Sequence, residues 1–231
     1  MLRFHDYRFL TFDCYGTLIN WEKGIFSALR PILNAHGKNT NVVRLLELYG
    51  DLEAEIQKGA YRSYRDVLRA VVRGFGEKLG FVPTPAEENS LPDSVSSWEP
   101  WPDSAEALHR LESRYRLVII SNIDDDIFKA TALRLPVKFA DVITAQQARC
   151  YKPALGIFRL ALERIGASPS EVLHVGQSAY HDVIPAKSLG MDAVWVNRPS
   201  AREGIGAVTA ASGHPDLEVR SVALLADAAL V

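Results

Sequence analysis

The sequence predicts an α/β fold, in which a Rossmann-like, doubly wound parallel sheet core carries an inserted all-helical cap. Short apolar runs bounded by polar residues alternate with amphipathic segments, which is typical of strands joined by helices into a parallel sheet. The runs are apolar almost without interruption, as expected of strands that helices cover on both faces. Residues 20–99 break this alternation, because their apolar residues follow helical spacing only.

Each apolar run is expected to form one strand. The runs are "YRFLTF" (7–12), "YRLVIIS" (115–121), "ADVITA" (140–145), "EVLHVG" (171–176) and "DAVWVN" (192–197). A shorter run, "LEV" (217–219), is expected to form a last strand before a final helix. The Gly-, Ala- and Ser-rich stretch 200–215 before it is expected to be a loop.

The helical stretch divides the chain into two parts. "NVVRLLELYGDLEAEIQKG" (41–59) and "SYRDVLRAVVRGFGEKLG" (63–80) have helical spacing and end in Gly-containing turns. The next segment is rich in Pro, Ser and acids, but two tryptophans near its end favour packing and partial helix. We therefore predict that residues 1–19 and 100–231 form the core and that residues 20–99 form the cap, which could serve as a lid.

Composition and charge exclude several classes of partner. Charged residues make up 23% and apolar residues 48% of the chain, as in ordinary soluble domains. A net charge of −2 without a Lys/Arg-rich stripe argues against nucleic acid and leaves a small molecule as the substrate. No apolar run reaches the roughly 18 residues of a membrane span, and no signal peptide precedes the first strand, so we expect a cytoplasmic protein that does not bind membranes. The apolar cap helices are compatible with a homodimer.

The chain has only two cysteines, Cys14 and Cys150, which lie far apart in the sequence. Two such residues do not make a disulfide framework, so a reduced compartment is expected. Cys14 could act as a thiolate nucleophile beside Asp13. No histidine lies within a few residues of it, and a small buried filler at the strand end is the favoured interpretation.

Polar residues follow the first two strands where a parallel sheet binds its ligands, at the carboxyl edge near the switch in strand order. Asp13 is followed by Gly16, which suits a tight loop, and by Thr17, whose hydroxyl can bond a carboxylate or a ligand. A turn-forming aspartate is the alternative for Asp13. Ser121 and Asn122 could present a hydroxyl and an amide to an anion, cap the next helix, or do both.

Two further charged residues are expected at the same edge. Lys152 precedes a proline and is therefore held extended, just ahead of a helix that we expect Pro153 to start. Its charge would keep Asp13 ionised at neutral pH, whereas a solvated surface lysine is the alternative. Asp182 falls in the first turn of a helix after the fourth strand, where the helix dipole alone also favours an acid. His181 is interpreted as an exposed helix-start residue without a role.

These four clusters, in this order, resemble the haloacid dehalogenase superfamily. "FDCYGTL", "SN", "YKP" and the segment ending in Asp182, with "VWVNR" after it, look most similar to the (S)-2-haloacid dehalogenase branch. The resemblance implies that Asp13 attacks C2 of a short 2-haloacid, expels halide with inversion and forms an ester that water hydrolyses. It also implies that Asp182 and Lys152 activate this water and stabilise charge. Carboxylates would be positioned by Thr17, Ser121 and Asn122, and the substrate would be contacted by Tyr15 and Phe158.

Two positions separate this chain from the phosphatases of the superfamily. Phosphatases carry an Asp two residues after the nucleophile, because an alkoxide leaving group needs a proton, and Tyr15 stands there in this chain. A halide is a very weak base and leaves without a proton. Gln177 stands where phosphatases place a magnesium-binding acid, and a hard dication prefers carboxylates. The resemblance therefore implies a reaction without metal or other cofactor.

The resemblance is incomplete in the cap. The dehalogenase branch has a cap arginine that helps to receive the halide, and "VVRLLELYGDLEAE" offers only Arg44, which we interpret as a surface residue of an amphipathic helix. Phe158 also stands where the branch has a tyrosine. Two alternatives stay open: a magnesium-dependent small-molecule phosphatase of the same superfamily, and a non-catalytic binding protein that keeps the fold.

Overall fold

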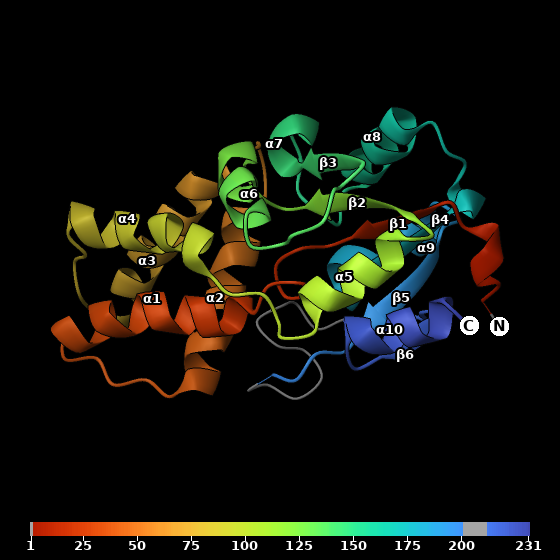
Figure 1. Ribbon diagram of the computed structural model, residues 1–231. Coiled ribbons are helices and arrows are strands. Elements are labelled where there is room, and N and C mark those ends of the chain that lie inside the picture. The colour runs from red at the N-terminus through yellow and green to blue at the C-terminus, as the bar shows by residue number, and fades with distance from the viewer. Residues whose placement is uncertain (1, 201–211) are drawn as a thin grey trace.

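The computed structural model describes residues 2–200 and 212–231, and its centre is a six-stranded parallel sheet (Figure 1). The strand order is β3-β2-β1-β4-β5-β6. The strands are β1 (Phe9–Phe12), β2 (Arg116–Ser121), β3 (Asp141–Thr144), β4 (Val172–Gly176), β5 (Asp192–Val196) and β6 (Leu217–Val219). Every predicted strand is confirmed, and each pairing is parallel as expected.

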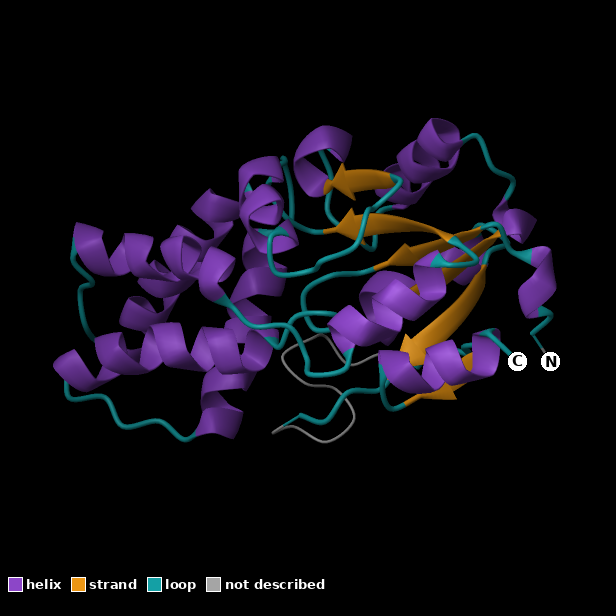
Figure 2. Ribbon diagram, viewed as in Figure 1, coloured by secondary structure: helices purple, strands orange, loops and turns teal. Residues whose placement is uncertain are grey.

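The sheet is doubly wound around β1, which lies between β2 and β4. From β1 the chain builds β2 and β3 on one side, then crosses back to build β4, β5 and β6 on the other. The switch in direction therefore lies next to the end of β1, where such sheets bind their ligands. Figure 2 shows that the carboxyl ends of β1, β2 and β3 point toward the helical part of the molecule.

Helices cover both faces of the sheet, as the apolar strands predict. On one face Leu10 and Phe12 pack with α5 (Ser104–Glu112) and α10 (Val222–Ala229). On the other face Phe9 packs with α8 (Leu155–Ile165) and α9 (Ile184–Ser188). Successive strand residues point to opposite faces, so an uninterrupted apolar strand supplies both cores.

Four helices form the cap: α1 (Trp21–Ala35), α2 (Val42–Ile56), α3 (Tyr64–Leu79) and α4 (Pro85–Ser94). Each begins after a residue whose side chain accepts a hydrogen bond from the first turn, namely Asn20, Asn41, Ser63 and Thr84. Helix α4 lies in the Pro- and Ser-rich segment, which confirms the partial helix predicted there. The two chain crossings between cap and core lie side by side, because Ile19 and Pro100 form an antiparallel bridge.

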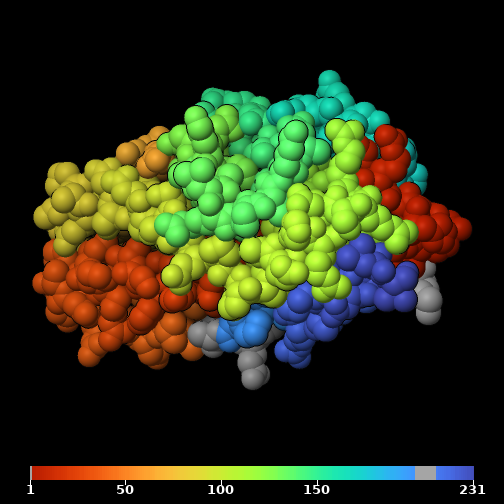
Figure 3. Space-filling model, in the orientation of Figure 1, coloured from red at the N-terminus to blue at the C-terminus, as the bar shows by residue number. Residues whose placement is uncertain are grey.

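The cap packs directly on the core. One cluster of buried apolar side chains includes Ile25 of α1, Tyr49 of α2 and Val67 of α3 together with Phe12 of β1. On the face shown in Figure 3, the cap, coloured red to yellow, is in contact with the core. The remaining elements are α6 (Asp125–Ala132), α7 (Ala145–Ala148), short 3₁₀ turns at Phe4–Asp6, Val95–Ser97 and Pro169–Glu171, and a π-helical turn at Ala179–Val183.

The structure excludes one alternative and corrects one prediction about helix starts. Helix α6 begins at Asp125 after Asp124, so Ser121 and Asn122 do not cap it. Helix α8 begins at Leu155 and not at Pro153, because Lys152 and Pro153 lie in a turn that the hydrogen bond from Ala154 N–H to the carbonyl of Tyr151 closes. Most of the loop predicted over 200–215 lies outside the described residues. Within the described residues, no helix is both long and apolar enough to cross a membrane.

Candidate active site

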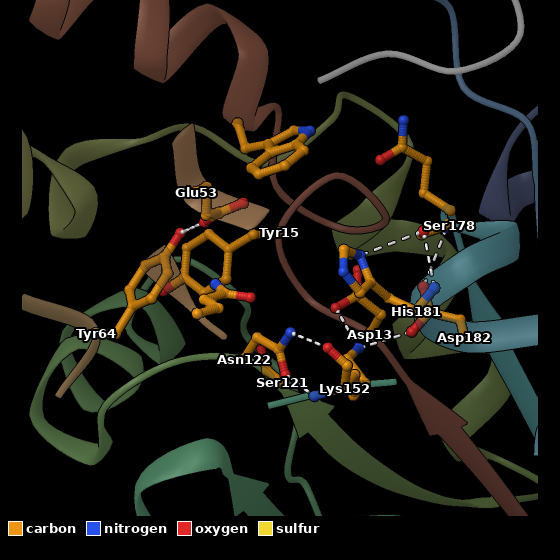
Figure 4. Close-up of a pocket in the computed structure, with 13 residues that line it drawn as sticks. Asp13, Tyr15, Glu53, Tyr64, Ser121, Asn122, Lys152, Ser178, His181 and Asp182 are labelled. Carbon is orange, nitrogen blue, oxygen red and sulfur yellow. Dashed lines mark hydrogen bonds and ion pairs between the residues drawn. The ribbon is translucent and has the colours of Figure 1, made fainter. Parts of the chain in front are cut away.

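A buried lysine joins two carboxylates at the carboxyl edge of the sheet (Figure 4). Lys152 Nζ donates hydrogen bonds to Asp13 Oδ1 at 2.8 Å, to Asp182 Oδ1 at 2.7 Å and to the carbonyl of Ile120 at 3.0 Å. The lysine is 2% exposed, so the alternative of a surface lysine is excluded. Residues far apart in the sequence meet here because β1, β2 and β4 are neighbours in the sheet.

The loop after β1 holds the second oxygen of Asp13. Thr17 Oγ1 donates to Asp13 Oδ2 at 2.8 Å and accepts a hydrogen bond from the backbone N–H of Gln177. The guanidinium of buried Arg198 donates twice to the carbonyl oxygen of Thr17. Both oxygens of Asp13 therefore have donors, which fixes the orientation of the carboxylate.

Asp182 is held from the other side by β4 and the turn that follows it. The backbone N–H of Ser178 donates to Asp182 Oδ2 at 3.0 Å. His174 Nε2 lies 3.3 Å from Asp182 Oδ1, and its Nδ1 lies 2.9 Å from Thr11 Oγ1. All these groups are buried, so Asp182 is a rigid partner of the lysine.

The three charges set one another's protonation. Burial opposes the charge on Lys152, but the two carboxylates outweigh it and raise the pKa of the lysine. Burial also raises the pKa of Asp13, and the charge of Lys152 offsets this only in part. Burial also raises the pKa of Asp182, but Lys152 and His174 lower it by more. The pKa of Asp182 is therefore well below the usual range. With Asp13 ionised, the trio carries a net charge of −1.

Ser121, Asn122 and Tyr15 also line the pocket. Asn122 and the backbone of Lys152 exchange two hydrogen bonds, at 2.7 and 3.2 Å, so the amide holds the lysine loop in place. The hydroxyl of Tyr15 is bonded to Thr131 at 2.7 Å. Its ring, and not its hydroxyl, is therefore free to form the wall of the pocket.

Three residues lie away from the pocket. Phe158, which we expected to contact the substrate, is fully buried under the sheet with its ring centre 5.1 Å from that of His174, so its role is packing. Arg44 lies on the surface and pairs with Glu47, as interpreted from the sequence. Cys14 is fully buried, and burial raises the pKa of its thiol well above the usual value, in agreement with a filler role.

The cap adds residues that the sequence analysis did not single out. Trp21, Glu53, Gln57 and Tyr64 line the pocket. Glu53 follows Tyr49 by one helical turn, so an acid on the apolar stripe of α2 was the available signal. His181, interpreted as an exposed residue, is half-buried and lines the pocket, where burial lowers the pKa of its imidazole to about 4.

The pocket that these residues line has a volume of about 40 Å³. It shares Gln57, Lys152 and His181 with a larger cleft of about 530 Å³ between α2 and the core, which offers a route of approach. Such a cavity accepts a small molecule only. The pocket places an oriented carboxylate beside a fixed cation.

The donor set does not fit a magnesium ion. Among residues 2–200 and 212–231, no three His, Cys, Asp or Glu side chains are grouped so that they could hold a metal ion. Asp13 and Asp182 already share the ammonium of Lys152. The neighbouring side chain of Gln177 supplies a neutral amide, which a hard cation binds less well than a carboxylate.

Gly16 is the position in this loop that a side chain would disturb most. Its φ of +102° lies outside the left-handed helical well, and an added Cβ would lie 2.2 Å from Oε1 of Gln177. The Gln177 side chain can move aside, but the backbone strain stays, so Gly16→Ala should lower the free energy of unfolding by about 2 kcal/mol.

Gly37→Ala is the matched control for urea unfolding of Gly16→Ala. Gly37 has a φ of +65°, and an added Cβ there would have no atom within 4 Å. Gly37→Ala should therefore lower the free energy of unfolding by only about 1 kcal/mol. Equal unfolding free energies for the two variants would contradict the special strain assigned to Gly16.

Comparison with known proteins identifies the family of this chain. A family model described as haloacid dehalogenase-like hydrolase matches residues 7–190. The chain belongs to the haloacid dehalogenase-like hydrolases. Among members of this family, the (S)-2-haloacid dehalogenase 4A of Burkholderia cepacia is 27% identical over 201 residues, which cover 83% of each chain.

Two further relatives show the range of the haloacid dehalogenase-like hydrolases. A glyceraldehyde 3-phosphate phosphatase of Methanothermobacter thermautotrophicus is 34% identical over 101 residues, but this covers only 42% of the present chain. The structure of the L-2-haloacid dehalogenase from Xanthobacter autotrophicus with chloropropionic acid covalently bound has a TM-score of 0.79 at 21% identity. The match covers 96% of this chain and 97% of the dehalogenase chain, so the core and the cap both have the same fold as that structure.

Proposed function

We propose that this protein is a 2-haloacid dehalogenase that acts on short substrates through an aspartyl ester on Asp13, without a metal or other cofactor. The observation that carries the proposal is the environment of Asp13. Its carboxylate is oriented by Lys152 and Thr17, while the position two residues later holds Tyr15, whose hydroxyl is bonded to Thr131. The site thus has a nucleophile and no carboxylic acid at that position to protonate a leaving group.

The first step needs only Asp13 and the groups that orient it. An oxygen of Asp13 forms a bond to C2 of the substrate as the carbon–halogen bond breaks, and the halogen leaves with the electron pair as halide. Halide is stable as an anion, so no proton is supplied. Lys152 keeps its charge throughout and holds Asp13 aligned for attack.

In the second step, water attacks the carbonyl carbon of the Asp13 ester. The alkoxy group leaves as the 2-hydroxyacid, and Asp13 is regenerated with one oxygen from water. We assign activation of this water to Asp182 and stabilisation of the developing negative charge to Lys152. The net reaction converts haloacid and water into hydroxyacid, halide and a proton.

Halide release from 2-chloropropionate in the presence of EDTA tests this function. The purified protein should release halide at the same rate with EDTA and with added magnesium, because neither step uses a metal. The control is a panel of phosphate monoesters assayed under both conditions. Magnesium-stimulated phosphate release, together with inertness toward every short haloacid, would show that the protein is a phosphatase instead.

A further inference from the structure

Trp21, the first residue of α1, has a buried hydrogen-bond donor without a partner. Among side-chain polar atoms of the described residues, its Nε1 is the one buried without a hydrogen bond. The indole lies on the pocket beside Gly16, since an added Cβ at Gly16 would lie 3.1 Å from Nε1. Because a buried N–H is costly to leave unpaired, a donor in this position indicates a ligand that accepts from it.

Glu53 of α2 presents a carboxyl group to the same pocket. Its Oε1 accepts hydrogen bonds from the hydroxyls of Tyr64 at 2.7 Å and Tyr49 at 3.1 Å. Its other oxygen has no hydrogen-bond partner within the described residues, and Figure 4 shows Glu53 on the opposite side of the pocket from Asp13 and Lys152. The side chain is 8% exposed, so this second oxygen is available to a ligand in the cavity.

The net charge of the pocket determines whether an anionic ligand can bind next to ionised Glu53 or only next to protonated Glu53. Asp13, Lys152 and Asp182 together leave one negative charge, and a carboxylate substrate adds a second. An ionised Glu53 would add a third within one small cavity that holds a single cation, and no arginine is among its lining residues. Burial favours the neutral acid and raises the pKa of Glu53 to about 7.

We infer that protonated Glu53 and the indole N–H of Trp21 form a two-donor binding site for the carboxylate of a short monocarboxylic acid. The inference rests on the proposed function, because the negative charge of the ligand is that of the proposed 2-haloacid substrate. With Oε1 occupied by the two tyrosines, the acid carries its proton on the oxygen that faces the cavity and donates from there. Both donors come from the cap, whereas the nucleophile comes from the core.

Several other titratable groups face Glu53. They are Tyr49 on its own helix, Tyr64 on α3, Tyr151 on the core, and Asp13, Lys152, His181 and Asp182 across the pocket. The tyrosines and Lys152 have raised pKa values, and those of His181 and Asp182 are lowered, so none of these titrates near pH 7. Asp13 is unchanged in every variant compared below, so a pH dependence that Glu53→Gln removes belongs to Glu53, whereas one that persists in Glu53→Gln belongs to another group such as Asp13.

Binding of propionate, an unreactive monocarboxylate, measured by calorimetry tests the inference directly. Because ionisation of Glu53 removes a donor and adds a like charge, the full-length protein should bind propionate roughly 30-fold more weakly at about pH 8.5 than at about pH 6. At the higher pH, binding should take up one proton, seen as a dependence of the heat on the buffer. Glu53→Gln keeps an N–H donor and should bind about equally at both pH values without proton uptake.

Two further variants complete the test. Trp21→Phe should weaken binding at pH 6 about tenfold. Glu47→Gln, the same change on the exposed side of α2, should behave as the wild type. Absence of binding at pH 6, equal wild-type affinity at both pH values, or an unchanged pH dependence in Glu53→Gln would overturn the inference. Normal propionate binding without halide release from any haloacid would instead refute the proposed function alone.

Discussion

Asp13→Asn should lower halide release from 2-chloropropionate at least about a thousandfold, because a neutral amide is a poor nucleophile toward C2. The wild-type rate and the variant rate are compared at saturating substrate. The Asn side chain keeps the size of Asp13, its single oxygen can still accept from Lys152, and the Thr17 hydroxyl can turn to accept from the amide that replaces the other oxygen. The loss should therefore reflect chemistry and not unfolding, which a thermal melt of the variant checks.

Turnover in oxygen-18 water gives the ester route a direct signature. In the wild type, mass analysis of the peptide that contains Asp13 should show label in its carboxylate, because water attacks that carbon. The control for Asp13→Asn is Asp227→Asn, the same change at an exposed residue of α10 that pairs with Arg110, and this variant should keep full activity. Label that enters only the hydroxyacid product over many turnovers, with an unlabelled Asp13, would mean direct attack of water on the substrate.

Lys152→Met should remove activity and also destabilise the fold by about 3–5 kcal/mol, because it leaves two buried carboxylates without their cation. Asp13 and Asp182 lie 2.8 and 2.7 Å from Nζ, and their mutual repulsion would no longer be compensated. Urea unfolding at neutral pH measures the loss. Protonation of a carboxylate relieves the repulsion, so the deficit should shrink as the pH falls.

Two companion variants separate charge from packing at Lys152. The double variant Lys152→Met with Asp182→Asn should regain part of the lost stability and none of the activity. Lys187→Met breaks surface pairs with Asp192 and Asp216 and should cost no more than about 1 kcal/mol. If Lys152→Met proved as stable as Lys187→Met, the buried trio would not be the electrostatic unit described above.

The local pattern of the chain was sufficient for the fold and for the residues that follow its strands. Uninterrupted apolar runs such as "LVIIS" identify strands covered on two faces, and parallel strands bring their carboxyl ends together whatever the details of packing. The sequence therefore predicts that Asp13, Lys152 and Asp182 share one site. Helix starts were less secure, because Asp124 and Ser121 are both capable caps and the sequence does not rank them.

The cap side of the pocket was decided only by tertiary structure. Trp21, Glu53 and Tyr64 reach the pocket through the packing of α1, α2 and α3 on the core, and helical spacing says which residues share a face but not what that face meets. The same limit explains Phe158, whose position in the sequence suggested substrate contact while α8 turns it under the sheet. Sequence alone determined the α/β core and the charged residues at its carboxyl edge, because strand direction brings those residues together. Which groups face that edge from the cap depends on long-range packing.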